Sequence, residues 1–463
     1  MIRKNSAART FLCLLLAFVF AASCLPQTIF ATTDKKTVTT WPEGPENNSG
    51  AVCLLDADTG AVLYDKNMDE QRYPASITKI LTALLIIENK QMTDTVTFGE
   101  HAVSESIPGN ARINVQLGET ITVEDALHAI LLASANEVCT QLAIDIAGSE
   151  EGFAAMMNER AAELGCTGTH FCNPCGLHED DHYTTAHDLY LIAKEAMKDA
   201  TFRDIVSTVQ HRMAKTNLHE ERIILTTNQL IFSSFQPWSY ANCLGIKTGH
   251  TSQAGNCFVG YAEYGDAKLF SVVLGCSSSS KEYPTVAASF TDTKSLCQWG
   301  FENFTSKTLA RQGEEVTYTK VKLSTDTNQV ILTAKNDLVS LLPRELDVKD
   351  LELQSDIPEE IAAPIKAGDT IGSVTYTYDG RDYGTVELVA LNDISRSTVL
   401  FYADKLSSFF QSIVFKVLLL AAAAFFLLHI FTGLVFGGVR RRRRRRSSRS
   451  RYNDSTYQRR HRK

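Results

Sequence analysis

The stretch that decides the fold is Pro74-Ala75-Ser76-Ile77-Thr78-Lys79-Ile80-Leu81-Thr82-Ala83-Leu84-Leu85-Ile86-Ile87-Glu88-Asn89. Its apolar residues recur at three- and four-residue intervals, which predicts a helix from about Ser76 to about Asn89 that packs into a core. Ser76 and Lys79 stand one turn apart, so they share a face and the amine can reach the hydroxyl. By itself this pair also fits a helix cap followed by a solvated lysine. Lys79 lies on the same apolar side as the core leucines, however, which is a poor place for a charge without a role.

Patterns on both sides of this stretch predict a mixed fold. Alternating strands with tight turns between them are expected at 51–55, 61–64, 255–264 and 267–275. Further helices are expected at 123–147, 151–164, 185–199 and 286–303. The fold class is therefore α/β, more narrowly α+β, with an antiparallel sheet flanked by helices. After residue 304, strand-like runs at 315–323, 329–334, 370–378 and 384–391 predict a separate small all-β domain.

Two more triplets follow the first motif in the chain. Ser134-Ala135-Asn136 comes after an apolar run, and Lys247-Thr248-Gly249 follows 113 residues later. SxxK, then SxN, then KTG is the signature of serine β-lactamases and penicillin-binding proteins. The chain resembles the low-molecular-mass penicillin-binding proteins, the serine-type D-alanyl-D-alanine carboxypeptidases. Other landmarks in family order are 171–177, His182-Tyr183-Thr184-Thr185-Ala186, 245–251, Trp299-Gly300-Phe301 and Ala367-Gly368-Asp369-Thr370-Ile371-Gly372.

The resemblance covers roughly residues 50–392 and implies a β-lactamase/transpeptidase-like domain with three catalytic residues. A serine hydroxyl is a poor nucleophile until a neighbouring group takes its proton. Lys79 can take it only as a neutral amine, a form that desolvation and the nearby positive Lys247 favour. Ser76 is thus the expected nucleophile, and Ser134 is expected to relay a proton to the leaving group. One departure from the family pattern is Glu137, which stands where Asp is often seen.

By the same resemblance, a second set of residues binds the substrate. Asn136 is expected to hold its backbone, and Lys247 and Thr248 its terminal carboxylate. The backbone N–H groups of Ser76 and His250 are expected to bind the oxyanion. The substrate-binding set is therefore Asn136, Lys247, Thr248, Gly249 and His250.

These roles predict an enzyme that removes the terminal D-alanine from peptidoglycan stem peptides through an acyl-enzyme. β-Lactam antibiotics are the expected covalent inhibitors, and no cofactor is expected. A D,D-endopeptidase acting on cross-links is the same reaction with another leaving group. A non-catalytic β-lactam-sensing or wall-binding module would predict broken motifs, whereas all three are intact. A class A β-lactamase would need a further glutamate on a loop between SxN and KTG, and no convincing ExxxN arrangement occurs there.

A group of cysteines and histidines offers a rival interpretation of one loop. Cys172, Cys175, His178 and His182 follow the pattern Cx2C then Hx3H, but only two residues separate the pairs, which is too short for familiar zinc spacing. A redox CxxC is a second alternative. We expect no metal, and a turn near the active site. Nine of the eleven cysteines follow the predicted signal peptide, and most sit in apolar runs, so buried free thiols are favoured over the disulfide framework usual in exported proteins.

Both termini indicate a membrane. Residues 1–31 have the basic start, short apolar core and small-residue exit of a signal peptide. An uncleaved anchor and a lipoprotein processed at Cys24 are weaker alternatives. The apolar run 417–439 is 23 residues long, or about 35 Å as a helix, which spans a bilayer. Seven arginines follow at 440–446, and the preference of basic residues for the cytoplasm places the tail inside and the body outside.

The expected organisation follows the chain in order. A linker at 32–49 precedes the catalytic domain at 50–303, the β domain at 304–393, a juxtamembrane segment at 394–412, a transmembrane helix at 413–439 and an Arg-rich tail at 440–463. The chain has a net charge of −7 although the tail is strongly basic, so the body carries all of the acidic excess. This balance argues against nucleic acid as a partner. The two terminal segments make the cell membrane, with its lipids, the expected location.

Overall fold

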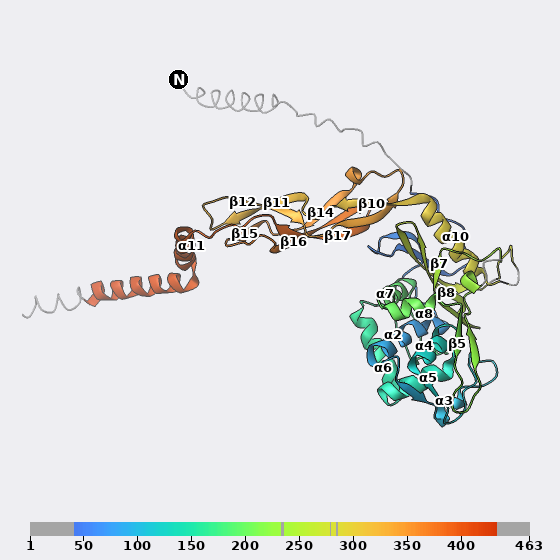
Figure 1. The fold of residues 1–463 in the computed structure, drawn as a ribbon. Helices are drawn as coiled ribbons and strands as arrows, with labels where there is room; N and C mark the ends of the chain where they lie inside the picture. The colour runs from blue at the N-terminus through green and yellow to red at the C-terminus, as the bar shows by residue number, and fades with distance from the viewer. Residues whose placement is uncertain (1–40, 233–235, 278, 284–285, 433–463) are drawn as a thin grey trace, which may run out of the picture.

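The structure is a computed structural model that describes residues 41–432 except 233–235, 278 and 284–285. A five-stranded antiparallel sheet organises the first domain (Figure 1). Its strands, in spatial order, are β2 (Val62–Lys66), β1 (Ala51–Asp56), β9 (Ala267–Cys276), β8 (Gly255–Tyr264) and β7 (Cys243–Thr251). The predicted alternating strands are thus present, with β7 added beside β8.

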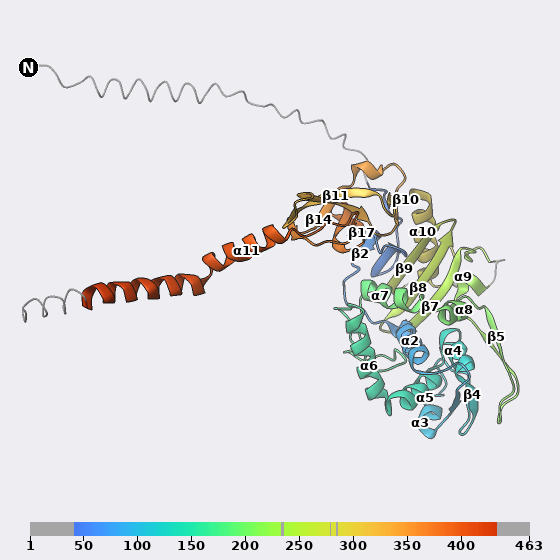
Figure 2. The ribbon, with the colours of Figure 1, turned by 60° about the vertical axis from the view of Figure 1, so that its left-hand side comes forward.

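The two faces of this sheet pack against different helices. In β1, Ala51, Cys53 and Leu55 join one apolar core, whereas Val52 and Leu54 join another, as the two-residue period of a strand requires. The first core contains the helices on one side of the sheet, and the second contains α10 (Ala288–Asn303) on the other side (Figure 2). The flanked antiparallel sheet predicted from the sequence is confirmed.

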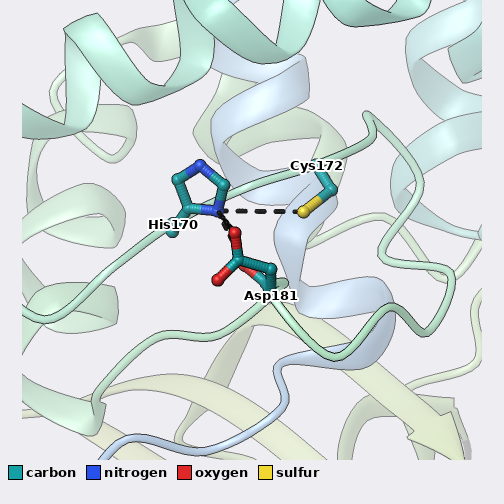
Figure 3. A group of neighbouring side chains, drawn as sticks. All are labelled: His170, Cys172 and Asp181. Atoms are coloured by element: carbon teal, nitrogen blue, oxygen red, sulfur yellow. Dashed lines mark hydrogen bonds and ion pairs between the residues drawn. The ribbon is translucent and has the colours of Figure 1, made fainter.

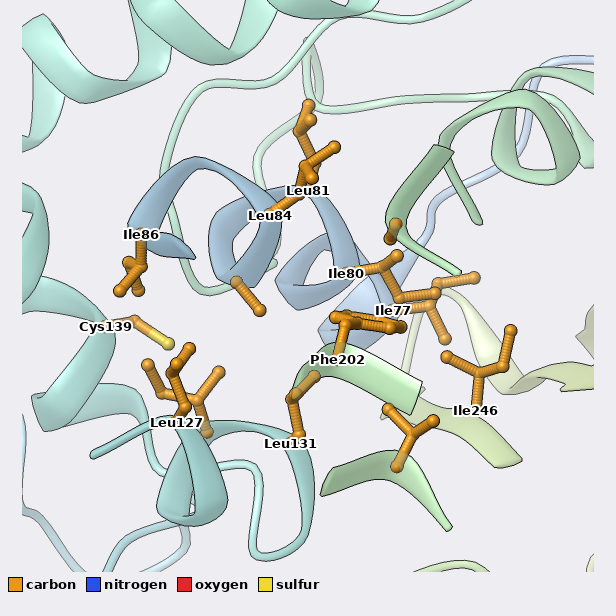
Figure 4. Packing of buried hydrophobic residues seen from close by; sticks show 14 of the residues in the cluster. Ile77, Ile80, Leu81, Leu84, Ile86, Leu127, Leu131, Cys139, Phe202 and Ile246 are labelled. Atoms are coloured by element: carbon orange, nitrogen blue, oxygen red, sulfur yellow. The ribbon is translucent and has the colours of Figure 1, made fainter. Parts of the chain in front are cut away.

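The helical side is built around α2 (Lys79–Asn89), which begins directly after a 3-10 turn, η1 (Ala75–Thr78). Figure 4 shows the packing around α2, where the labelled side chains are Ile77, Ile80, Leu81, Leu84, Ile86, Leu127, Leu131, Cys139, Phe202 and Ile246. Its neighbours are α4 (Val123–Leu131), α5 (Asn136–Ala147), α6 (Glu150–Glu163), α7 (Ala186–Ala196) and α8 (Ala200–Val206).

The single helix predicted at 123–147 is wrong, because the chain breaks between α4 and α5. Ser134, in the break, has φ 63°, which no residue of a right-handed helix can adopt. Apolar periodicity continues through the break, so the pattern gave no sign of it.

Short elements that the sequence did not predict complete this domain. They are β3 (Thr95–Thr97), α3 (Glu100–Ser104), β4 (Thr120–Thr122), β5 (Gln210–Met213), β6 (Arg222–Leu225) and α9 (Gln229–Phe232).

The second domain is a β structure with its own apolar core. Its six-stranded sheet has the order β14 (Glu352–Asp356), β16 (Thr370–Tyr378), β17 (Arg381–Ala390), β12 (Gln329–Ala334), β11 (Glu315–Lys322) and β15 (Glu360–Ala362). A separate pair is formed by β10 (Phe304–Ala310) and β13 (Leu338–Pro343), and a 3-10 turn, η2 (Val348–Asp350), follows. The predicted β character is confirmed, but β10, β13, β14 and β15 were not expected.

Polar contacts join the two domains at the turn that follows β1. One carboxylate oxygen of Asp56 accepts hydrogen bonds from the backbone N–H of Leu341, at 3.0 Å, and from the Ser340 hydroxyl, at 3.3 Å. The Arg381 guanidinium lies 4.1 Å from the ring centre of Trp41. Residues 41–49, expected to be part of a linker, are therefore packed: Trp41 Nε1 donates to the Leu63 carbonyl at 3.1 Å.

Two helices extend from the far end of the β domain (Figures 1 and 2). The helix α11 (Thr398–Gln411) buries no residue. The next helix, Ile413–Thr432, has a mean hydropathy of 2.5, is unburied, and is long and apolar enough to cross a membrane. The predicted signal peptide, the end of the predicted span and the Arg-rich tail lie outside the described residues.

Candidate active site

The Lys79 amine lies at the centre of a small hydrogen-bonded cluster. Its Nζ is 3.2 Å from Ser76 Oγ, 2.8 Å from Asn136 Oδ1 and 2.5 Å from the Cys175 carbonyl oxygen. The Lys79 side chain is completely buried. Two of these three neighbours can only accept hydrogen bonds, so the third position of the amine faces the serine hydroxyl.

Two glycines allow the backbone to reach this serine. A Cβ atom at Gly249 would lie 3.2 Å from the backbone nitrogen of Ser76 and 2.9 Å from the carbonyl oxygen of Pro74. A Cβ atom at Gly176, which has φ 77°, would lie 1.9 Å from the Ala75 carbonyl oxygen. Only glycine fits at either place, and strand β7 consequently runs directly past the turn that carries Ser76.

The break between α4 and α5 presents the SxN motif. The left-handed backbone of Ser134 turns its side chain out of the helical path, and its hydroxyl is buried without a hydrogen-bond partner among the described residues. Asn136 begins α5, and its backbone N–H donates to the Ala111 carbonyl at 2.8 Å. The motif thus combines a fixed amide with a hydroxyl that is available to a ligand.

Strand β7 carries the KTG motif. The Lys247 side chain is buried, and its Nζ donates to the Thr248 carbonyl at 3.1 Å. Burial, followed by the positive charge of Lys79, lowers the pKa of Lys247 to about 7. The Thr248 hydroxyl lies 2.6 Å from that of Thr227, and His250 is exposed beyond the motif.

These residues meet at one cleft of about 480 Å³. Five of the eight predicted site residues line it: Ser76, Ser134, Thr248, Gly249 and His250. The other three, Lys79, Asn136 and Lys247, are buried. A reactive hydroxyl at the surface of a cleft, with an amine buried behind it, is an arrangement suited to acyl transfer.

Comparison with known proteins agrees with this geometry. Residues 37–278, more than half of the chain, match the family model for D-alanyl-D-alanine carboxypeptidase, and residues 304–396 match that for the C-terminal domain of penicillin-binding protein 5. The chain belongs to the D-alanyl-D-alanine carboxypeptidase family. It is accordingly a serine peptidase with the penicillin-binding fold that the three motifs indicated.

Individual members of the carboxypeptidase family resemble the chain over most of its length. The D-alanyl-D-alanine carboxypeptidase DacF of Bacillus subtilis is 32% identical over 74% of this chain and 85% of its own. The carboxypeptidase DacA of Escherichia coli is 29% identical over 85% of this chain and 93% of its own. The crystal structure of penicillin-binding protein 5 from Haemophilus influenzae superposes with a TM-score of 0.64 at 28% identity and covers 78% of this chain and all of that one.

Several contacts around the carboxypeptidase site were not predicted from the sequence. The Cys175 carbonyl that holds Lys79 is a backbone group, which no side-chain pattern can reveal. His182 Nε2 lies 2.9 Å from the Thr78 hydroxyl, within the SxxK turn. The Glu137 carboxylate is buried and accepts backbone hydrogen bonds from Ile113, at 2.7 Å, and Asn114, at 3.1 Å, and burial raises its pKa.

The alternative of one zinc site made by Cys172, Cys175, His178 and His182 is excluded. The Cys175 thiol points inward and donates to the Asn136 carbonyl at 3.4 Å, while His182 is engaged with Thr78. His178 instead packs edge-on against Tyr73, with the ring centres 4.7 Å apart. The favoured free thiols are present at Cys53, Cys139, Cys166, Cys172, Cys175, Cys243, Cys257 and Cys297.

Proposed function

We propose that this carboxypeptidase cleaves the terminal D-Ala-D-Ala bond of peptidoglycan stem peptides, with Ser76 as the nucleophile and Lys79 as its base. The observation that carries the assignment is the 3.2 Å separation of Lys79 Nζ and Ser76 Oγ within a buried cluster. As a neutral amine, Lys79 donates to the Asn136 and Cys175 oxygens and directs its lone pair at the Ser76 proton.

The first step forms the acyl-enzyme. Ser76 Oγ attacks the carbonyl carbon of the penultimate D-alanine while its proton passes to Lys79 Nζ. The oxyanion that develops is held by the backbone N–H groups of Ser76 and His250, one from the serine turn and one from the passing strand. The C–N bond then breaks as Ser134 relays the proton from Lys79 to the departing D-alanine amine, which leaves Lys79 neutral again. Water attacks the ester in the second step and restores the serine.

Substrate binding is assigned to the KTG strand and Asn136. The terminal carboxylate lies in the part of the cleft that Thr248 lines, and the positive charge of Lys247 stabilises it from beneath. Asn136 holds the substrate backbone. The close approach at Gly249 keeps the substrate carbonyl within reach of both oxyanion donors. β-Lactams, which resemble the peptide terminus, acylate Ser76 by the same attack.

The rest of the chain holds this site outside the cell. We assign 50–303 to the catalytic domain and 304–393 to a β domain that separates it from the bilayer, with 394–412 as a juxtamembrane segment at the lipid surface. The exposed apolar helix Ile413–Thr432 supports an anchor in the membrane lipids. The Arg-rich tail at 440–463 is then cytoplasmic, and the predicted signal peptide at 1–31 directs export. Nucleic acid is not among the partners.

Intact-mass spectrometry of the full-length protein with benzylpenicillin tests the nucleophile. We expect a persistent adduct of one penicillin in the wild type and none in Ser76→Ala. Release of D-alanine from a pentapeptide that ends in D-Ala-D-Ala tests the substrate, and a cross-linked dimer of stem peptides is the matched endopeptidase substrate. Rapid loss of penicillin without an adduct would contradict the assignment, as would an adduct that persists in Ser76→Ala.

A further inference from the structure

Three side chains of different chemistry converge on the loop beside the active site (Figure 3). The Nδ1 atom of His170 lies 3.8 Å from the Cys172 sulfur and 3.5 Å from a carboxylate oxygen of Asp181. All three candidate ligand atoms lie within 4.8 Å of one another. This set shares only Cys172 with the four residues considered from sequence spacing, because Asp181 joins from across the loop.

The backbone holds the three residues in place. His170 and Tyr183 exchange two backbone hydrogen bonds, at 2.8 and 2.9 Å, which pair the two arms of the loop. The Cys172 N–H donates to Nδ1 of His182 at 3.1 Å. The ligand atoms therefore project from paired segments whose separation is fixed, which favours a preformed site.

Two of the three distances between these atoms are close to those around a tetrahedral zinc ion, and the third is at most 4.8 Å. Bond lengths of about 2.3 Å to sulfur and about 2.0–2.1 Å to nitrogen or oxygen place the ligand atoms roughly 3.6 Å apart for N and S and roughly 3.4 Å apart for N and O. The distances in this loop, 3.8 and 3.5 Å, differ from those values by a few tenths of an ångström. Thiolate, imidazole and carboxylate are also a donor set suited to zinc.

We propose that His170, Cys172 and Asp181 form a zinc site with one open position for water. Cys172 and His170 are half-buried and Asp181 is exposed, so an ion can enter from solvent. The acidic neighbours Glu179 and Asp180 add negative charge on the same loop.

One contact must change when the ion binds. His170 Nδ1 now lies 2.7 Å from the Asp181 carbonyl oxygen. Ligation uses the tautomer with its proton on Nε2, so this contact is exchanged for the metal bond, and the Cys172 thiol loses its proton to solvent.

The ion would act on the active site through structure alone. It would clamp the arm that carries Cys172 to the arm that carries Asp181 and, next to it, His182. His182 reaches the Thr78 hydroxyl in the serine turn, and the same loop supplies the Cys175 carbonyl to Lys79. The zinc site therefore braces the loop that positions the catalytic base, without touching the substrate.

Cobalt titration of the full-length protein in detergent, without a polyhistidine tag, tests the proposal. Co²⁺ reports a thiolate ligand by its charge-transfer absorption in the near ultraviolet. We expect a band that saturates at one equivalent, disappears when Zn²⁺ is added, and is absent in Cys172→Ser. Cys166→Ser is the matched control, because Cys166 is also half-buried but lies outside the cluster, and it should retain the band.

Two more variants and a fold check complete the test. His170→Gln and Asp181→Asn should each weaken Co²⁺ binding at least by the roughly 10- to 100-fold that loss of a supporting partner costs. Penicillin acylation of Cys172→Ser should match that of the wild type without metal, which shows that the variant is folded. A band that persists in Cys172→Ser, one that is lost in Cys166→Ser, or no band in the wild type would overturn the proposal.

Discussion

The catalytic domain and the β domain both contain antiparallel sheets, but they bury different groups. Among the described residues, the catalytic domain buries charged side chains at Asp56, Lys79, Glu119, Glu137, Asp188, Lys247 and Asp292. In the β domain the buried polar side chains are the neutral hydroxyls of Thr319, Thr333, Ser340 and Thr377. Burying a charge is costly unless it is well paired. The catalytic domain alone therefore bears the cost of buried charges, and two of them, Lys79 and Lys247, belong to the site.

Two buried lysines show this contrast most clearly. Lys79 has oxygen partners around its amine, whereas Lys247 has one backbone carbonyl and a pKa lowered to about 7. Burial and repulsion by the charge of Lys79 both act on Lys247, so Lys247 loses its proton near neutral pH.

Replacing Lys79 by Ala should have the largest effect. With no base for the Ser76 proton, we expect the rate of acylation by benzylpenicillin to fall by about 10²–10⁴-fold. Stopped-flow mixing with a chromogenic or fluorescent penicillin measures the rate. Lys194→Ala, which removes a partly exposed lysine that lies over the Tyr190 ring, is the control and should acylate normally. If Lys79→Ala were acylated at the wild-type rate, Lys79 would not be the base that accepts the Ser76 proton.

Gly249→Ala tests whether the catalytic domain also depends on a close backbone contact beside the reactive serine. The added Cβ meets backbone atoms of the serine turn, so β7 or the turn must shift. A misplacement of about 1 Å at reacting groups lowers a rate by about 10²-fold. We therefore expect losses of that size in the rate of penicillin acylation and in the rate of D-alanine release. Gly99→Ala is the control, because the nearest atom to its Cβ is a flexible Gln141 side chain at 3.6 Å. Equal rates for Gly249→Ala and the wild type would show that the close approach has no function.

The pH profile of kcat/KM should sharpen the assignment of Lys247. Its lowered pKa of about 7 leaves it positive below pH 7 and neutral above, so binding of the substrate carboxylate weakens as the pH rises. From the fraction protonated we expect a fall of roughly fivefold between pH 7 and pH 8. A bound carboxylate stabilises the lysine charge, so kcat should change less than KM. The arginine in Lys247→Arg stays protonated, so the decrease in kcat/KM should move to higher pH. If the decrease stays at the same pH in this variant, another group causes it.

The sequence predicted the reactive side chains of the site better than the backbone features that hold them in place. The SxxK, SxN and KTG motifs contain seven of the eight predicted site residues, and His250 directly follows KTG. The fold brings five of the eight to one cleft and buries the other three. The helix break at Ser134 was missed, since the apolar residues on both sides keep helical spacing. The Cys175 carbonyl and the close approach at Gly249 were missed because they depend on how distant segments meet.

The β domain shows which strands an apolar pattern can predict and which it cannot. Strands that contain Thr and Val, such as β12 and β16, were predicted with correct bounds. In β14, by contrast, every residue is exposed, and β15 is three residues long, so neither contains an alternating apolar pattern. Their strand structure comes from pairing with β16 and β11.

The smallest expected effect lies at the junction of the two domains, in Ser340→Ala. The Ser340 hydroxyl lies 3.1 Å from that of Thr59 and 3.3 Å from the Asp56 carboxylate, but this carboxylate keeps the Leu341 N–H as a partner at 3.0 Å. Losing one such bond costs about 1 kcal/mol in the free energy of unfolding, which urea titration measures. Asp56→Ala is the stronger counterpart, because it leaves the buried Leu341 N–H unpaired and should cost about 1–3 kcal/mol.

Acylation by penicillin should be unchanged in Ser340→Ala if the β domain only supports the catalytic domain. A slower acylation with normal stability would instead show that the junction transmits an effect to Ser76, and the division between chemistry and support would then fail.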